Sequence, residues 1–328
     1  MKNVTRDRGR KLPRHSVRVS AAYKALTMLL VLLLIVGIGL IAYPTVSDWW
    51  NQYHQSRAVA AYIEESENIG PSEAETMLAQ AEQYNAKLAA EPQSSRFDRT
   101  DERVKEYEST LDITGTGIMG YVTIPSIRVR LPIYHGTDDA VLQIAVGHMF
   151  GTSLPVGGDS SHAVVSGHTG LPSAKLLTEL DRLQDGDIFQ FHVLNRTYTY
   201  QVDQITVVLP KDLENIQITP DKDYATLVTC TPYGVNTHRL LVRGYRIPNP
   251  TTPDTTDYEL PLRIMRWVAV GLGLLILVMC IVLIVVQRLR KRKSTAEDLA
   301  ELSPLDMLSD FTVRVIYGTS GQRKKKEQ

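Results

Sequence analysis

The chain has 328 residues, with 36 basic and 36 acidic side chains and a formal net charge of zero. This balance argues against a nucleic-acid-binding protein, which needs a strong positive field. The charges are nevertheless unevenly placed, because basic residues cluster just before the first long apolar run and just after the last one. Clusters in these positions indicate how membrane-spanning segments are oriented.

Two apolar runs, within segments 25–43 and 263–287, are each predicted to cross a membrane. At about 1.5 Å per residue, roughly 20 apolar residues span a hydrocarbon layer ~30 Å thick. The basic flanks predict that segments 1–24 and 288–328 are cytoplasmic and that everything between the runs is extracytoplasmic. A cleaved signal peptide is the alternative for the first run, but its long basic leader and the lack of an Ala-x-Ala site favour a retained anchor.

Segment 44–116 is predicted to be a helical extension. Its alanine- and glutamate-rich part is broken by Gly70-Pro71, and Ser72 with Glu75 forms a capping box that would restart the helix. One face of the restarted helix carries an apolar stripe, formed by Leu78, Ala81, Tyr84 and Leu88. The stripe is typical of a face that packs on the following domain or that dimerises, and the pattern leaves both open.

Segment 117–248 is predicted to be a mainly β domain. Short alternating runs separated by Gly, Pro, Asn and Asp predict strands at 118–124, 131–134, 162–167, 187–194, 197–209, 224–230 and 239–246. One short helix is expected at 173–180. Many short strands with a single inserted helix favour a closed β-barrel. The Pro- and Thr-rich segment 249–262 is then an extended stalk to the second apolar run.

Cys230 is the one cysteine between the two apolar runs, since Cys280 lies inside the second. The two therefore cannot form a disulfide, and a lone extracytoplasmic thiol is either a small buried hydrophobe or a reactive group. A β-branched strand leads into Cys230, and a Pro/Gly/Asn turn separates it from Arg239. This setting favours reactivity.

A cysteine nucleophile needs a proton carrier and a group that stabilises charge on the attacked carbonyl. His168 ends an apolar run between two nearby glycines, and Arg239 follows Cys230 by nine residues. If the runs on either side of the turn pair as a hairpin, Cys230 and Arg239 face each other. We therefore predict that Cys230, His168 and Arg239 form one catalytic site.

These residues resemble the sortase family. Thr226-Leu-Val-Thr-Cys230 is similar to the sortase signature Thr-Leu-x-Thr-Cys, with the family's arginine at Arg239 and its histidine at His168. The stretch Ser166-Gly-His-Thr-Gly-Leu-Pro172 is typical of class C, the pilus-assembling sortases. The resemblance runs from about Gly117 to Pro248, and it implies a closed sortase-type β-barrel.

Class C sortases usually carry a lid over the active cysteine, with an Asp-Pro-aromatic motif. The corresponding stretch here, residues 91–102, lacks that motif, and Phe97 with Asp98 is the pair that could replace it. If this pair forms a lid, the Phe97 ring is expected to fill an apolar groove and the Asp98 carboxylate to pair with Arg239. The alternative is that Phe97 is a stray aromatic on a polar loop.

Carried to this sequence, the resemblance implies a membrane-bound cysteine transpeptidase, an acyltransferase with thiol-protease chemistry. It would cleave a Leu-Pro-x-Thr-Gly-like sorting signal between Thr and Gly and join the acyl group to a lysine of another pilin. It implies partners that are pilin subunits in a two-pass protein of a Gram-positive-type cell membrane, and no metal or organic cofactor. Attachment of proteins to the cell wall and a degenerate membrane-tethered assembly module are the alternatives.

The further histidines of the resembling region include His148, His162 and His238. Their spacing matches no metal-binding motif, so structural hydrogen bonding is the better interpretation. Tyr233 and Asn236 are expected to form the turn after Cys230.

Overall fold

The structure is a computed structural model that describes residues 15–252, 254–258 and 260–300. It divides into one unit up to residue 262 and a second from residue 263 onward. Most of the predicted basic segment 1–24 and most of the tail 288–328 lie outside the described residues.

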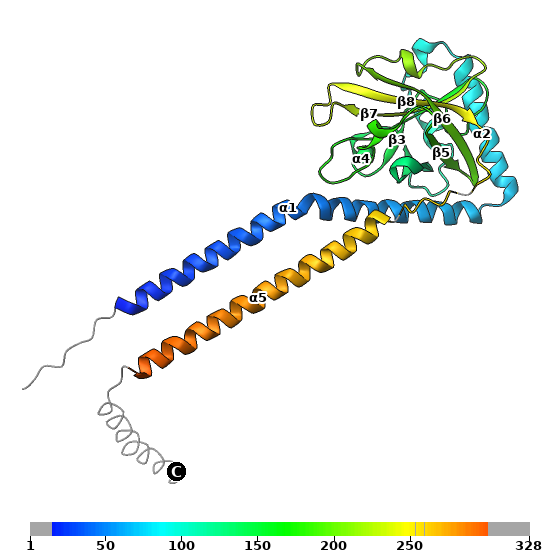
Figure 1. Ribbon diagram of the computed structural model, residues 1–328. Coiled ribbons are helices and arrows are strands. Elements are labelled where there is room, and N and C mark those ends of the chain that lie inside the picture. Colours follow the sequence, from blue (N-terminus) through cyan, green and yellow to red (C-terminus); the bar gives the residue numbers. More distant parts are fainter. Residues whose placement is uncertain (1–14, 253, 259, 301–328) are drawn as a thin grey trace, which may run out of the picture. The chain divides into compact units, whose positions relative to one another are not determined.

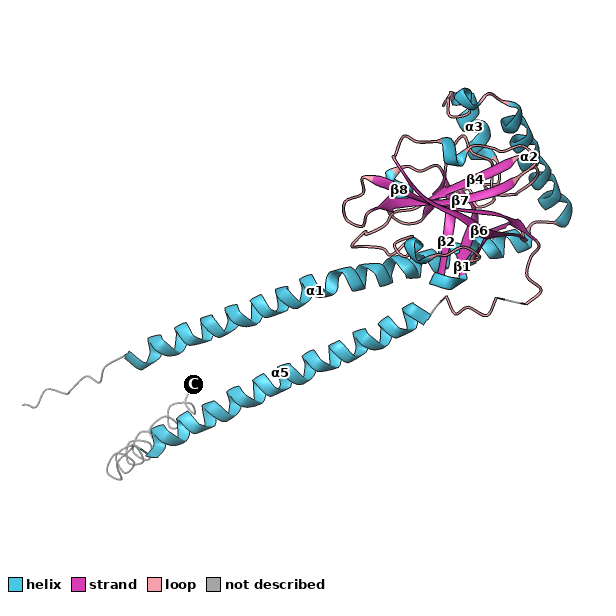
Figure 2. Ribbon diagram, turned by 45° about the horizontal axis from the view of Figure 1, so that its top comes forward, coloured by secondary structure: helices cyan, strands magenta, loops and turns pink. Residues whose placement is uncertain are grey.

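Eight strands close into a barrel, as the alternating pattern predicts (Figure 2). The strands are β1 Ile118–Ile124, β2 Val129–His135, β3 Val146–His148, β4 Ser161–Ser166, β5 Ile188–Val193, β6 Arg196–Val208, β7 Asp223–Thr231 and β8 His238–Ile247. Around the barrel the order is β1-β2-β3-β4-β7-β8-β6-β5. The pairs β2–β3 and β4–β7 are parallel and the others antiparallel.

The barrel interior is filled by alternate residues of the strands. On β7, Ala225 and Leu227 belong to the main core, while Val228 belongs to a second cluster. Because successive strand residues point to opposite faces, Cys230 lies on the face of Val228, outside the barrel core. The barrel therefore acts as a rigid frame, and its outer surface carries the candidate site.

The predicted helical extension is present as three helices, α1 His15–Asn68, α2 Pro71–Ala90 and α3 Asp101–Ser109. Short helical turns complete the unit: η1 Gln93–Ser95, η2 Pro125–Ile127, α4 Asp139–Leu142, η3 Leu180–Arg182 and η4 Glu214–Ile216. The described residues of the second unit belong to α5, Leu260–Ala300, which begins just before the boundary between the units. Apolar stretches of α1 and α5 are long enough to cross a bilayer, which suggests membrane anchoring.

Helix α1 continues past its apolar stretch and runs beneath the barrel (Figure 1). Tyr62 fixes it there, because the buried hydroxyl donates to Met119 O at 3.0 Å and accepts from Leu194 N at 3.1 Å. Asn51 Nδ2 adds a bond to Ser173 O at 2.7 Å. The helix that carries the first apolar stretch is thus bonded directly to the barrel domain.

The apolar stripe of α2 packs on the barrel domain, which decides between the two alternatives. Leu78, Ala81 and Leu88 are buried, and the Asn85 amide bonds both Leu154 O and Leu154 N, at 3.1 and 2.7 Å. The predicted capping box at Ser72 is wrong: α2 begins at Pro71, with Gly70 at the N-cap and no side-chain cap. Proline suits the first helical position because it needs no N–H partner there.

The helix predicted at 173–180 is also wrong, since the segment is a series of turns before η3. Leu176 has φ of +40°, which no α-helix allows. The backbone groups of Ser173 and Lys175 are bonded instead by Asn51 and Asp48 of α1. Contacts with α1 therefore replace the intrahelical bonds that local sequence favours.

Candidate active site

Cys230 and Arg239 lie directly opposite each other in the β7–β8 ladder, as the hairpin prediction requires. Directly opposed residues of an antiparallel pair have Cβ atoms about 4.5–5.5 Å apart and share one face. Both side chains are half-buried. The thiol and the guanidinium thus border the same stretch of the outer barrel surface.

The loop between β7 and β8 holds the Arg239 guanidinium through backbone carbonyls. Its Nη1 donates to Asn236 O at 3.3 Å and to His238 O at 3.1 Å. Asn236 has φ of +60°, and its N–H bonds Pro232 O at 2.9 Å. Asn tolerates this left-handed conformation, so the predicted turn-forming role of Asn236 is confirmed. Arg239 retains further N–H donors for a substrate.

His168 is brought to the level of Cys230 by the parallel β4–β7 pair. Ser166 pairs with Val228, and the next residue, Gly167, donates its N–H to Val228 O at 3.0 Å. The Thr229 hydroxyl donates to Gly167 O at 2.7 Å and so fixes the chain just before His168. The ends of β4 and β7 and the start of β8 therefore bring His168, Cys230 and Arg239 to one end of the barrel.

A small apolar cluster lies on the same sheet face, next to the site. Val228 and Leu241 form a cross-strand pair that is two residues from the Cys230–Arg239 pair, and Val164 and Ile216 complete the buried cluster. Phe97 packs on it. The ring also covers Gly151, where an added Cβ would come within 2.6 Å of the Phe97 ring. Phe97 therefore lies on the surface that adjoins Cys230, and contacts with segments distant in the sequence hold it there.

Two arginines hold the segment that carries Phe97. The buried Arg96 donates to Ala89 O and Glu91 O at the end of α2, and Arg103 bonds Ser95 O and the Glu91 carboxylate. Asp98 is exposed, and no ion pair joins Asp98 to Arg239 among the residues that the structure describes. The two members of the proposed lid pair therefore have different surroundings.

His148 and His162 are structural, as expected. His148 bonds the Tyr107 hydroxyl and Ser153 O, and His162 bonds Gln217 O and the Thr226 hydroxyl. Burial lowers the pKa of each imidazole to about 4, so both are neutral near pH 7. His238, the third, bonds the neighbouring Thr237 hydroxyl at 2.9 Å.

No cluster of three or more His, Cys, Asp or Glu side chains within the described ranges is arranged to hold a metal.

The sequence reasoning missed one contact beside the site, that of Tyr233 with Gly170. The Tyr233 ring lies about 3.1 Å from the position that a Cβ of Gly170 would take, so it bridges the loops after Cys230 and His168. Only a glycine at φ of +71° permits this approach. The glycine after His168 was a signal for it.

Comparisons with known proteins support the resemblance to sortases that the sequence motifs indicate. The sortase domain model matches residues 122–247. Sortase C1 from Streptococcus agalactiae is 48% identical, with a TM-score of 0.57, over 59% of this chain and 100% of that one. A Streptococcus pneumoniae sortase C, whose structure is described in terms of catalysis and pilin substrate specificity, is 41% identical, with a TM-score of 0.54, over 60% and 100%.

A more distant similarity is to sortase A of Streptococcus agalactiae serotype III, which is 32% identical over 117 residues. That match spans 35% of this chain and about half, 47%, of the relative. The closed barrel and the match to the full length of the S. agalactiae sortase C1 structure point to the same family. The chain belongs to the sortase family of cysteine transpeptidases, and within it to class C.

Proposed function

We propose that the chain is a membrane-anchored pilin polymerase. It cleaves a Leu-Pro-x-Thr-Gly-like sorting signal between Thr and Gly and joins the threonine carbonyl to a lysine amine of another pilin subunit. The observation that carries the proposal is the opposition of Cys230 and Arg239 in one ladder, with His168 at the adjoining strand end. The similarity to class C structures supports pilins as substrates.

In the first half-reaction the Cys230 thiolate attacks the threonine carbonyl carbon. The Arg239 guanidinium donates to the developing oxyanion or to the adjacent substrate backbone, and one such donor is typically worth about 10²–10³ in kcat. His168 gives a proton to the glycine nitrogen as the C–N bond breaks, a role worth roughly 10²–10⁴. The products are a thioester on Cys230 and a free glycine amine.

In the second half-reaction a lysine amine attacks the thioester. His168, now neutral, takes the proton that the amine loses, and the Cys230 thiolate leaves. The new bond is an isopeptide, and the enzyme returns to its starting state. A half-buried thiol suits this sequence, because the site must admit two macromolecular substrates in turn.

The proposed topology places both termini in the cytoplasm and the barrel outside. The basic flanks of the two apolar runs support it. Because α1 is one unbroken helix from its apolar stretch to the barrel, it limits the distance between the active site and the bilayer. Reporter fusions after Gln328 should be active only inside the cell. Cleavage of an epitope at that position by a protease added outside the cell would contradict the topology.

Peptide cleavage by the full chain in detergent tests the chemistry. Cys230→Ala should abolish cleavage of a Leu-Pro-x-Thr-Gly peptide. Cys280→Ser, which removes the other cysteine, is the matched control and should keep wild-type activity. Turnover near wild type in Cys230→Ala would sink the assignment.

Polymerisation of pilins and attachment to the cell wall differ in the amine that resolves the thioester. Deletion of the gene, followed by blotting of wall extracts, separates them. Loss of a high-molecular-weight pilin ladder is expected. An intact ladder with loss of wall-attached monomers would favour attachment instead.

A further inference from the structure

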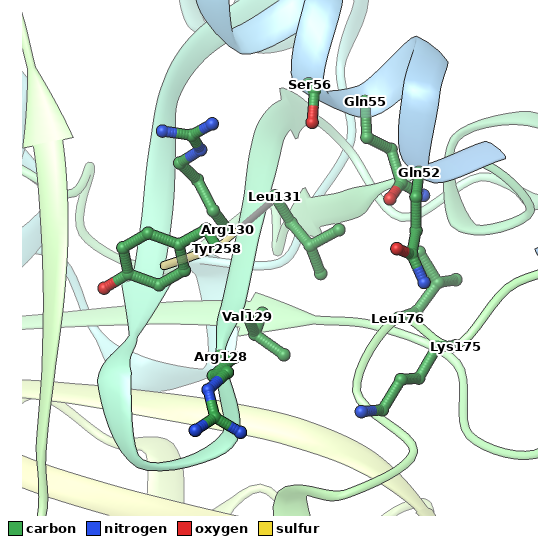
Figure 3. A pocket seen from close by; sticks show the side chains of 10 residues that line it. All are labelled: Gln52, Gln55, Ser56, Arg128, Val129, Arg130, Leu131, Lys175, Leu176 and Tyr258. Atoms are coloured by element: carbon green, nitrogen blue, oxygen red, sulfur yellow. The ribbon is translucent and has the colours of Figure 1, made fainter. Parts of the chain in front are cut away.

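A pocket between α1 and β2 contains none of the three candidate catalytic residues and is lined by three cations. Figure 3 shows residues of α1 on one side and the β2 strand on the other. The ten lining residues are Gln52, Gln55, Ser56, Arg128, Val129, Arg130, Leu131, Lys175, Leu176 and Tyr258. None is acidic. The hollow of about 50 Å³ has room for several waters or one tetrahedral oxyanion.

Arg128 is held in the pocket by an unusual backbone conformation. It ends η2 with φ of +52°, in the left-handed region that favours glycine. Its side chain is exposed and has no ion pair among the described residues. A long cationic side chain at a position suited to glycine points to a role for the charge.

The other two cations have partners, which set the local charge. Arg130 lies over the Tyr258 ring, 5.5 Å from its centroid, and Lys175 pairs with Glu179. Asp48 accepts the Lys175 N–H and the Gln52 amide, so its carboxylate is already bonded. The Ser56 hydroxyl has no hydrogen-bond partner within the described ranges and adds a neutral donor. The pocket thus keeps a net positive lining with unused donors.

The pocket lies close to the expected bilayer surface. Gln52, the first residue of α1 that lines the pocket, comes nine residues after Tyr43, about 14 Å along the helix, and two residues, about 3 Å, after Trp50; it therefore lies just beyond a headgroup layer that is roughly 5–8 Å thick. Pro44 lies inside α1, and the helix bends before it passes the barrel, which lowers the pocket further (Figure 1). Trp50 is 58% exposed, as expected for a ring at the membrane interface.

We propose that this pocket binds a phosphate group, supplied by an anionic lipid headgroup of the outer leaflet. The headgroup would be gripped by Arg128 together with Lys175 and Ser56. Binding there would fix the barrel at one orientation above the bilayer, since the pocket joins α1 to β2. The inference rests on the proposed membrane anchoring and is independent of the chemistry at Cys230.

Lipid titration of the full-length chain in neutral detergent tests the proposal. Native mass spectrometry counts the phosphatidylglycerol and phosphatidylcholine molecules retained. Arg128→Gln should weaken phosphatidylglycerol binding about fivefold, the usual weight of one basic residue at an anionic surface. Arg128→Gly removes the same charge and suits the left-handed backbone, so it should fold and show the same loss.

Arg57→Gln is the matched control, because Arg57, like Arg128, is an exposed arginine, but it lies on α1 outside the pocket. It should change binding less than twofold. Equal losses in the Arg57 and Arg128 variants, or no loss in either Arg128 variant, would overturn the site. Preference of the wild type for phosphatidylglycerol over phosphatidylcholine is expected, and equal retention of the two would also overturn it.

Inorganic phosphate distinguishes the two sources of the group. If a free anion is the natural occupant, millimolar phosphate should displace phosphatidylglycerol completely, which would overturn the lipid assignment. Persistence of the lipid under those conditions supports it. The titration needs no intact membrane, so a failed topology experiment and a failed lipid titration are separate results.

Discussion

Phe97 is predicted to restrict access to Cys230. The ring packs on the cluster that contains Val228 and Leu241, the same-face neighbours of Cys230 and Arg239. A sorting signal that reaches the thiol along this face would have to displace it. Truncation to Phe97→Ala should therefore raise the reactivity of the Cys230 thiol.

The magnitude follows from the buried area of the ring. A phenylalanine side chain buries about 150–250 Å² when fully enclosed. Phe97 is partly buried, so about 100 Å² is a fair share, worth about 2.5 kcal/mol at 25 cal/mol per Å². If all of it held the segment closed, the open population would rise about seventyfold on truncation, which is an upper limit. The bonds of Arg96 and Arg103 hold the chain on either side and need not break.

The assay is the rate of modification of Cys230 by a charged thiol reagent, in a Cys280→Ser background of the full chain. We expect an acceleration of about ten- to fiftyfold for Phe97→Ala. Asp98→Ala is the matched control, since the Asp98 carboxylate is exposed, and it should stay within twofold of wild type. The double variant should match Phe97→Ala. Equal rates in wild type and Phe97→Ala would refute gating by this ring.

Three other predictions concern stability and catalysis. Asn85→Ala should lower the free energy of unfolding by roughly 1–3 kcal/mol, because it leaves the buried Leu154 N–H unpaired, whereas Leu154 O keeps its bond from Val156 N. Gln83→Ala on the exposed face should change it little, and urea unfolding measures both. Burial lowers the pKa of His162 to about 4, so between pH 6.5 and 4 the unfolded chain binds a proton at this imidazole and the folded chain does not. The free energy of unfolding should therefore fall as the pH is lowered from 6.5 to about 4. His162→Gln should reduce this pH dependence, measured as urea midpoints. Arg239→Lys should reduce kcat/KM about 10²–10³-fold, and a loss below fivefold would remove its proposed role.

The barrel and the pairing of Cys230 with Arg239 were predictable because both depend on local patterns. Alternation marks most strands, and the length of the turn between the two residues sets their register. The three-residue strand β3 was missed because so short a run carries no periodic signal. The helix expected at 173–180 failed because α1, distant in the sequence, takes its backbone hydrogen bonds.

The surroundings of Phe97 could not be predicted from sequence, since they depend on tertiary packing. The cluster on which it packs draws residues from β4, β7, β8 and η4. Likewise, nothing in the local sequence indicates that Arg128 adopts a left-handed conformation beside α1. Motif resemblance indicated the proposed reacting groups, whereas the groups proposed to control access and membrane contact are seen only in the folded chain.

The central claim is that Cys230 forms a thioester with the threonine of a sorting signal. The direct test is to mix the full-length protein with a Leu-Pro-x-Thr-Gly peptide without an amine acceptor, quench in acid and map the adduct by mass spectrometry. We predict that the acyl portion ending in threonine is found on Cys230 and is released when a lysine-containing peptide is added before quenching. An adduct on another residue, or undiminished cleavage by Cys230→Ala without any adduct, would contradict the account.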